Sequence, residues 1–211
     1  MYPSYTRSER VADGSMHAIG VTGAVLGAIL LLVWAAPVAS PWQIAAISVY
    51  AITLIVTFTA SAFYHMTPWE SIRPVLRRID HAAIYLKIAG TYTPLVVMIG
   101  SGLAYVMLGI VWIMAIIGMV LKLVFWRTPG RFGPLLYLVM GWMSIVLIWS
   151  SWSELPFGYI LAGGLLYTFG VVFYAAEKMK FSNAIWHGFV VAASACFFVA
   201  ITIVVTQKGL V

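Results

Sequence analysis

Seven long apolar stretches occupy almost the whole chain and decide what it can fold into. Most are about 20 residues long, the length at which an α-helix crosses the hydrocarbon core of a bilayer. A helix satisfies its own backbone hydrogen bonds, which lipid cannot do, so such a run indicates a membrane span. Pro, Gly and charged residues separate the stretches, which lie at about 15–36, 41–65, 80–100, 103–125, 134–152, 157–175 and 184–206.

Charged residues are too few for a soluble protein. Only 9% of the residues are charged and 63% are hydrophobic, whereas soluble chains carry about 25% charged residues. The same composition excludes a disordered chain. The single cysteine, Cys196, excludes an intramolecular disulfide and a multi-cysteine metal cluster. We therefore predict an all-α integral membrane protein, in which residues 1–211 form one seven-helix bundle.

The basic residues predict how the chain is inserted. Short cytoplasmic loops carry an excess of Lys and Arg, and nine basic residues fall on one side when the predicted helices alternate. Only Lys208 falls on the other side, while Lys87 and Lys122 lie within spans. The nine are Arg7, Arg10, Arg73, Arg77, Arg78, Arg127, Arg131, Lys178 and Lys180. We expect a cytoplasmic N-terminus, an external C-terminus and a place in a plasma membrane.

The formal net charge of +6 follows from this bias and needs no nucleic acid as a partner. Basic residues at the cytoplasmic face attract anionic lipids, so membrane lipids are the expected partners. Gly23 and Gly27 form a GxxxG pattern on the first span, which permits close helix packing. We expect this pattern to pack helices within the bundle, with a homo-oligomer as the alternative.

The ionisable residues of the spans gather at one depth. Asp80 and all four histidines lie near the cytoplasmic ends of their predicted spans, and the histidines are His17, His65, His81 and His187. We assign the remaining acids to the N-terminal tail or to loops, namely Glu9, Asp13, Glu70, Glu154 and Glu177. Asp80 is then the only acid on a span. Polar groups at such a depth face the bundle interior and have partners, so one shared site is expected.

Helical spacing places several of these residues on common faces. Ser61 and His65 are four residues apart, as are Asn183 and His187, so each pair shares one face of its helix. Imidazoles from two helices, with the Asp80 carboxylate holding a water, are the parts of a catalytic zinc site. The same residues also fit a hydrogen-bonded cluster that fixes the register of the helices without a metal.

Five motifs extend over nearly the whole chain. They are Ser61-Ala-Phe-Tyr-His65, Arg78-Ile-Asp80-His81-Ala-Ala-Ile-Tyr85, Ile88-Ala-Gly-Thr-Tyr-Thr-Pro94, Ala184-Ile-Trp-His187 and His17-Ala-Ile-Gly20. Together they resemble the hemolysin III family, the bacterial branch of the progestin and adipoQ receptor superfamily. The resemblance implies seven helices with the N-terminus inside, in agreement with the basic residues.

The resemblance also implies a zinc site near the cytoplasmic face. In the family, one histidine comes from the second helix and two come from an H-x3-H motif on the seventh. Carried over to this chain, His65 and His187 are ligands, Asp80 lies beside the metal and its water, and Ser61 is nearby. His17 and His81 are further candidates at the same depth.

The chain departs from the family pattern in the last helix. The first histidine of the H-x3-H motif is Asn183, and a later histidine that is common there is Phe197. An amide is a poor zinc ligand, so two models of the site remain open. In the first model, His65, His187 and Asp80 hold zinc and Asn183 hydrogen-bonds the bound water.

The second model has no metal. Lys87, at a position that is usually apolar in relatives, shares a helix face with Asp80 and pairs with it. Alternatively, Lys87 extends along the helix to the inner interface.

Three functions remain open at this point. The first is a zinc-dependent amidohydrolase acting on a ceramide-like lipid that enters from the bilayer, an activity with which animal relatives are credited. Asp80 would take the proton of the attacking water, and Ser61 would hydrogen-bond the developing oxyanion. The second is a non-enzymatic sensor or regulator of membrane lipids, and the third is a pore-forming cytolysin. Only the third span carries charges along one face, which argues against a pore.

Overall fold

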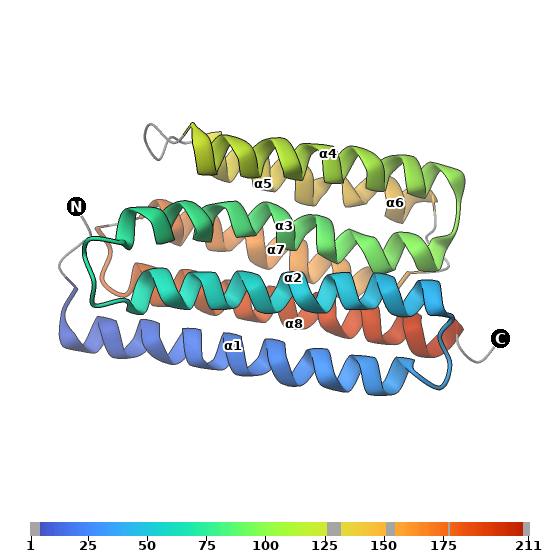
Figure 1. Ribbon diagram of the computed structural model, residues 1–211, viewed down its shortest axis with the longest axis horizontal. Coiled ribbons are helices and arrows are strands. Elements are labelled where there is room, and N and C mark those ends of the chain that lie inside the picture. Colours follow the sequence, from blue (N-terminus) through green and yellow to red (C-terminus); the bar gives the residue numbers. More distant parts are fainter. Residues whose placement is uncertain (1–4, 126–131, 151–154, 177, 209–211) are drawn as a thin grey trace.

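The computed structural model describes residues 5–125, 132–150, 155–176 and 178–208, and these residues are almost entirely helical (Figure 1). The long helices are α1 (Arg7–Ala35), α2 (Pro41–Met66), α3 (Arg73–Ile99), α4 (Gly102–Val124), α7 (Phe157–Ala175) and α8 (Ser182–Lys208). Two shorter helices, α5 (Phe132–Trp142) and α6 (Ser144–Ser150), lie between α4 and α7 in sequence. Six helices are long and apolar enough to cross a membrane. The predicted all-α membrane fold is therefore confirmed.

The long helices run side by side and form one bundle (Figure 1). α1 packs on α2, α2 on α3, and α3 on α4, whereas α8 returns to pack against α7, α1 and α3. Among the six candidate spans α3 is the most enclosed, with 72% of its apolar window buried against 17–44% in the others. α3 therefore forms the centre of the bundle.

The basic residues that predicted the orientation gather where α1 begins, which we call the basic end. Arg7 and Arg10 lie in the first turns of α1, and Arg73, Arg77 and Arg78 lie in those of α3. Lys178 and Lys180 directly precede α8. Arg127, Arg131, Glu154 and Glu177 are outside the described residues. The described basic residues thus have the one-sided distribution expected of a membrane protein.

Apolar side chains also cover the outside of the bundle. Leu26, Ile29 and Val33 of α1 and Ile110 and Ile113 of α4 are all exposed. Soluble proteins rarely expose large continuous apolar patches, whereas lipid tails are an apolar solvent for them. The outer surface of the protein is therefore suited to contact with lipid.

α1 begins eight residues earlier than the apolar stretch predicts. Thr6 and Glu9 form a capping box, in which the Thr6 amide donates to Glu9 Oε2 at 3.0 Å and the Glu9 amide donates to Thr6 Oγ1 at 3.4 Å. This arrangement satisfies two amides at the helix start and allows α1 to begin at Arg7. Asp13 consequently lies on α1, buried, and not in a tail. The assignment of Asp80 as the only acid on a span is wrong.

α3 also begins earlier than predicted, at Arg73 with Pro74 in its first turn. A proline is well accommodated there because the first amides of a helix have no partner within the helix. The helix ends at Gly100, whose φ of 72° lies in the left-handed region. Glycine adopts this conformation without strain, and Ser101 then caps the start of α4.

The predicted fifth span, 134–152, is interrupted at Met143 and forms α5 and α6 in place of one helix. The last carbonyls of a helix lack partners within it. Two of the last carbonyls of α5, those of Met140 and Gly141, accept hydrogen bonds from the Tyr92 hydroxyl of α3 at 2.7 Å and 3.0 Å. A side chain of the central helix therefore stabilises the interruption.

Glycines allow close packing between several helices. A Cβ atom placed at Gly90 of α3 would overlap the side chain of Thr53 on α2. In the GxxxG pattern of α1, a Cβ at Gly27 would lie 3.2 Å from the Phe198 ring of α8, whereas nothing lies within 4 Å of a Cβ at Gly23. Gly27 therefore packs within the bundle, as expected.

We expect Gly90→Ala to destabilise the detergent-solubilised protein by roughly 1–3 kcal/mol, the usual effect of overpacking. Thr53 is β-branched and has little rotamer freedom in a helix, so it cannot move aside easily. Gly109→Ala on α4 is the matched control, because nothing lies within 4 Å of the added Cβ. Thermal unfolding followed by circular dichroism compares the two, and equal melting temperatures would contradict the packing argument.

Candidate metal centre

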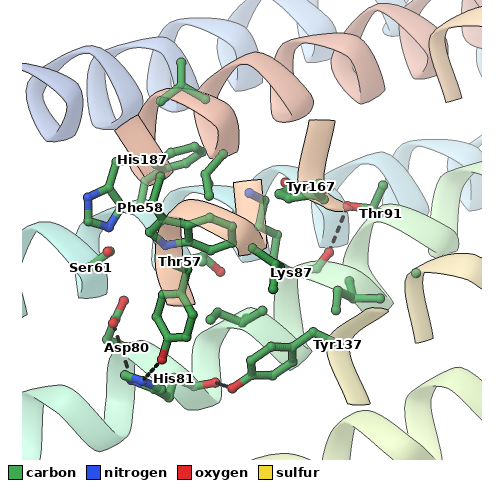
Figure 2. A pocket seen from close by; sticks show the side chains of 18 of the residues that line it. Thr57, Phe58, Ser61, Asp80, His81, Lys87, Thr91, Tyr137, Tyr167 and His187 are labelled. Atoms are coloured by element: carbon green, nitrogen blue, oxygen red, sulfur yellow. Dashed lines mark hydrogen bonds and ion pairs between the residues drawn. The ribbon is translucent and has the colours of Figure 1, made fainter. Parts of the chain in front are cut away.

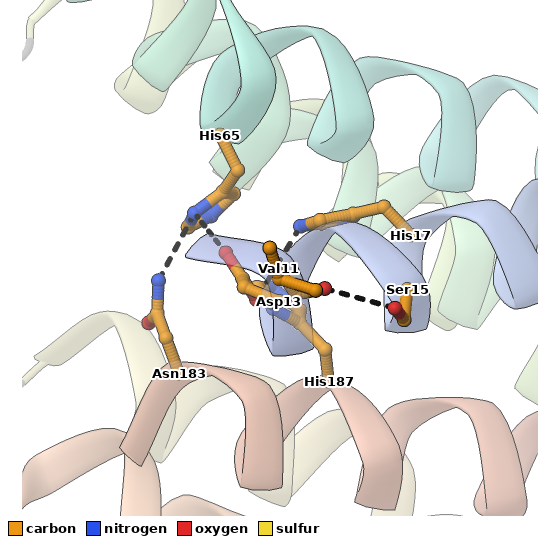
Figure 3. A network of polar contacts seen from close by, with 7 residues as sticks. All are labelled: Val11, Asp13, Ser15, His17, His65, Asn183 and His187. Atoms are coloured by element: carbon orange, nitrogen blue, oxygen red, sulfur yellow. Dashed lines mark hydrogen bonds and ion pairs between the residues drawn. The ribbon is translucent and has the colours of Figure 1, made fainter. Parts of the chain in front are cut away.

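Three helices bring one aspartate and three histidines together at the basic end (Figure 3). Asp13 and His17 lie one turn apart on α1, His65 lies in the last turn of α2, and His187 lies in the second turn of α8. Each side chain offers one ligand atom, and these atoms all lie within 4.8 Å of one another. We call these four residues the Asp13 cluster.

The carboxylate of Asp13 is the centre of this cluster. Its Oδ1 lies 2.6 Å from His187 Nδ1 and 3.7 Å from His17 Nε2. Its Oδ2 lies 3.5 Å from His65 Nδ1. All four side chains are at most 9% exposed. An ionised carboxylate at such a buried position needs polar partners, and the imidazoles provide them.

The imidazole rings also contact one another and Asn183. The ring centroids of His17 and His65 are 5.0 Å apart, and those of His17 and His187 are 4.2 Å apart. The side-chain amide of Asn183, one turn before His187, hydrogen-bonds to His65 Nδ1 at 3.0 Å. Groups that hydrogen-bond a ligating histidine orient its ring, so Asn183 positions His65.

The chemistry of the Asp13 cluster fits a divalent metal ion. His17 Nε2 is buried and has no hydrogen-bond partner within the described part of the chain, and such an atom needs an explanation. Imidazole nitrogens and a carboxylate oxygen are typical zinc ligands. Atoms bound to one zinc ion lie at most about 4 Å apart, so small side-chain movements would close the cluster around an ion.

A cavity of about 730 Å³ extends from the Asp13 cluster through the bundle interior (Figure 2). Near the basic end its walls include the polar side chains His17, His65, His187, Ser61, Asp80, His81, Tyr137 and Tyr174. Farther along, its walls include the apolar side chains Leu95, Leu155, Phe157, Ile160, Leu161 and Phe197. The volume is in the range of ligand pockets, and the division into halves suits an amphiphilic molecule.

Asp80 lies in the wall of the cavity and outside the Asp13 cluster. Its Oδ2 lies 3.6 Å from His81 Nδ1, and Ser61 faces its carboxylate (Figure 2). His81 is held by the Arg77 carbonyl, 2.8 Å from Nδ1, and by the Tyr174 hydroxyl, 3.4 Å from Nε2. The structure thus brings His65 and His187 together with His17, a further candidate from the sequence, and places the Asp13 carboxylate beside them where the sequence suggested Asp80.

Lys87 does not pair with Asp80. Its ammonium donates to Ser194 Oγ on α8 at 2.7 Å and lies 4.8 Å and 5.0 Å from the ring centroids of Phe58 and Tyr167. No ion pair among the described residues includes Lys87. The side chain is also buried, at 7% exposure, and does not reach the interface. Both expectations for Lys87 are wrong, because α8 offers a closer polar partner across the packing surface.

Asp13 is the site residue that the apolar stretches did not reveal. The pattern Thr6-Arg7-Ser8-Glu9 matches the capping-box signature. A helix that begins at Arg7 places Asp13 and His17 four residues apart on one face. This local signal, taken with the apolar stretch, would have identified the pair.

Comparison with known proteins finds relatives over nearly the whole chain. Residues 5–198 match the family described as Haemolysin-III related. The chain is 34% identical over 198 residues to the Hemolysin-3 homolog of Bacillus subtilis (strain 168), covering 92% of this chain and 93% of that protein. Hemolysin-3 of Bacillus cereus is 34% identical over 194 residues, covering 90% and 89%. The human Monocyte to macrophage differentiation factor is 28% identical over 202 residues, covering 92% and 83%.

We expect the purified protein to contain about one divalent transition-metal ion per chain, because the candidate ligand atoms of the Asp13 cluster all lie within 4.8 Å of one another. His17→Gln and His187→Gln should each lower the metal content at least about tenfold. Even the loss of a group that only hydrogen-bonds a metal ligand lowers metal affinity by about this factor. His81→Gln is the control, as this histidine lies outside the cluster. Elemental analysis by mass spectrometry measures the content. Equal metal content in the His17 and His81 variants would contradict the assignment.

Proposed function

The chain belongs to the hemolysin III family, and from this premise we propose that it is a membrane-embedded hydrolase that cleaves a lipid amide. One observation carries the proposal. The three histidines of the Asp13 cluster open onto a cavity that is polar beside them and apolar farther along. One cavity thereby combines a candidate metal site, a nearby carboxylate and a place for an acyl chain.

The three imidazoles of the Asp13 cluster would hold zinc and leave its fourth position open for water or substrate, as in catalytic zinc sites. Asp13, whose Oδ1 lies 2.6 Å from His187 Nδ1, and Asn183, which hydrogen-bonds His65, would orient the histidines from outside the set. When bound, zinc supplies Lewis-acid chemistry, which polarises a carbonyl and acidifies water. The role of the cluster is therefore to fix the reaction at the polar end of the cavity.

Asp80 is the proposed general base. Its carboxylate faces the same polar half of the cavity as His65 and His187, and its ion-pair partner among the described residues, His81 Nδ1, is 3.6 Å away. A carboxylate oxygen of Asp80 would take a proton from the attacking water and return it to the leaving amine nitrogen. Ser61, which faces Asp80, would donate a hydrogen bond to the carbonyl oxygen as negative charge develops there.

The shape of the cavity supports a lipid amide as the substrate. A ceramide-like molecule joins a polar amide to a long acyl chain, and the cavity joins a polar half to an apolar half. The apolar wall would hold the acyl chain by burial of its surface. Such a substrate would enter from the bilayer and not from water.

A second candidate function is a lipid sensor without catalysis. The 2.6 Å contact between Asp13 Oδ1 and His187 Nδ1 favours it, because a short charge-assisted hydrogen bond stabilises the bundle without any metal. The cavity would then bind a lipid whose presence changes the packing of the helices. Catalytic turnover distinguishes the two functions.

We expect Asp80→Asn to slow release of fatty acid from ceramide in liposomes at least about 100-fold, the contribution of a general base. The metal content should be unchanged, because Asp80 is outside the Asp13 cluster. Glu70→Gln is the control, since the Glu70 side chain is 75% exposed and pairs with Arg73. If metal-loaded wild-type protein releases no fatty acid, the hydrolase is excluded and the sensor remains.

A further inference from the structure

Lys87 lies where the cavity changes from polar to apolar. Asp80 is seven residues nearer the basic end on α3, and His187 is seven residues nearer that end than Ser194 on α8. Seven residues of helix measure about 10 Å. The hydrogen-bonded pair of Lys87 and Ser194 therefore lies about 10 Å deeper in the bundle than Asp80 and His187 do.

The described residues around the Lys87 ammonium do not satisfy all of its N–H donors and do not neutralise its positive charge. It carries three N–H donors, and its hydrogen-bond acceptor among the described residues is Ser194 Oγ at 2.7 Å. Ser194 in turn donates to the Val190 carbonyl at 2.6 Å, and the Tyr167 hydroxyl lies 3.1 Å from Ser194 Oγ. The described part of the chain provides no carboxylate for this buried cation, although ionisable groups within a membrane usually have a counter-charge.

We propose that Lys87 binds the carboxylate of a single-chain fatty acid, with the hydrocarbon tail in the apolar half of the cavity. Lys87 lines this cavity together with Tyr167 (Figure 2). Among the described residues, Ser194 accepts one of the three N–H groups of Lys87, and the other two supply donors for the two carboxylate oxygens. From there the cavity wall continues with Leu95, Ile160 and Phe197, which would contact the tail.

The charge at Lys87 favours a carboxylate over a phosphate. One ammonium and one carboxylate form a neutral pair, which is the arrangement that buried charges require. A phosphate monoester carries close to two negative charges and more acceptor oxygens, which one lysine and two hydroxyls would leave partly unsatisfied. This carboxylate site lies two helical turns from the Asp13 cluster, and binding at Lys87 does not depend on whether that cluster catalyses hydrolysis.

The test is equilibrium binding of palmitate to the purified full-length protein in nanodiscs. We expect Lys87→Met to weaken palmitate binding about 10–100-fold, the usual effect of losing a hydrogen bond to a charged group. Lys87→Arg should restore most of the affinity. Replacing a buried charge by an apolar side chain of similar length is often tolerated by the fold, and thermal unfolding of each variant checks this.

The wild-type protein alone provides a second measurement that needs no variant. Hexadecanol has the same chain without the charge and should bind at least about tenfold more weakly than palmitate, since it lacks the charge-assisted bond. Equal binding of the two, or tighter binding of hexadecyl phosphate, would overturn the assignment. Protein treated with a metal chelator should still bind palmitate, and loss of binding on chelation would place the carboxylate at the Asp13 cluster.

Discussion

Several polar groups inside this bundle find partners on other helices, because lipid offers none. Thr57 on α2 donates to the Ala83 carbonyl on α3 at 2.9 Å, and Tyr92 connects α3 to α5. Lys87 connects α3 to α8, while Asp13 connects α1 to α2 and α8. α3 takes part in three of these four connections, which is consistent with its place as the most enclosed span.

The same requirement explains why the stabilising groups and the proposed site coincide. An apolar bundle in lipid gains little from burying more apolar surface, because lipid tails are as apolar as its core. Polar side chains are therefore tolerated only where several helices meet, and such places leave irregular gaps between the helices. In this protein the gap is the cavity beside α3, whose walls include His65, Asp80 and Lys87.

The sequence predicted the fold more fully than the site. Apolar length located six spans and gave the bounds of α2, α4, α7 and α8 to within two residues, since the membrane thickness dictates that length. It did not locate the start of α1, because a capping box can extend a helix beyond the hydrocarbon region, and Asp13 was misplaced for this reason. Spacing along one helix grouped His65 with Ser61, yet it gave the wrong partner for Lys87. That partner, Ser194, depends on how α3 packs against α8, and no pattern within one helix contains this information.

The buried formal charges link the two proposed sites. Asp13, Asp80 and Lys87 are the buried residues with full formal charge in the described ranges, and with neutral histidines they leave one negative charge inside the bundle. A divalent ion at the Asp13 cluster would change this to one positive charge, and a carboxylate at Lys87 would then bring it to zero. Because uncompensated charge is costly in a low-dielectric interior, each ligand would compensate the charge nearest to it, the metal ion that of Asp13 and the carboxylate that of Lys87.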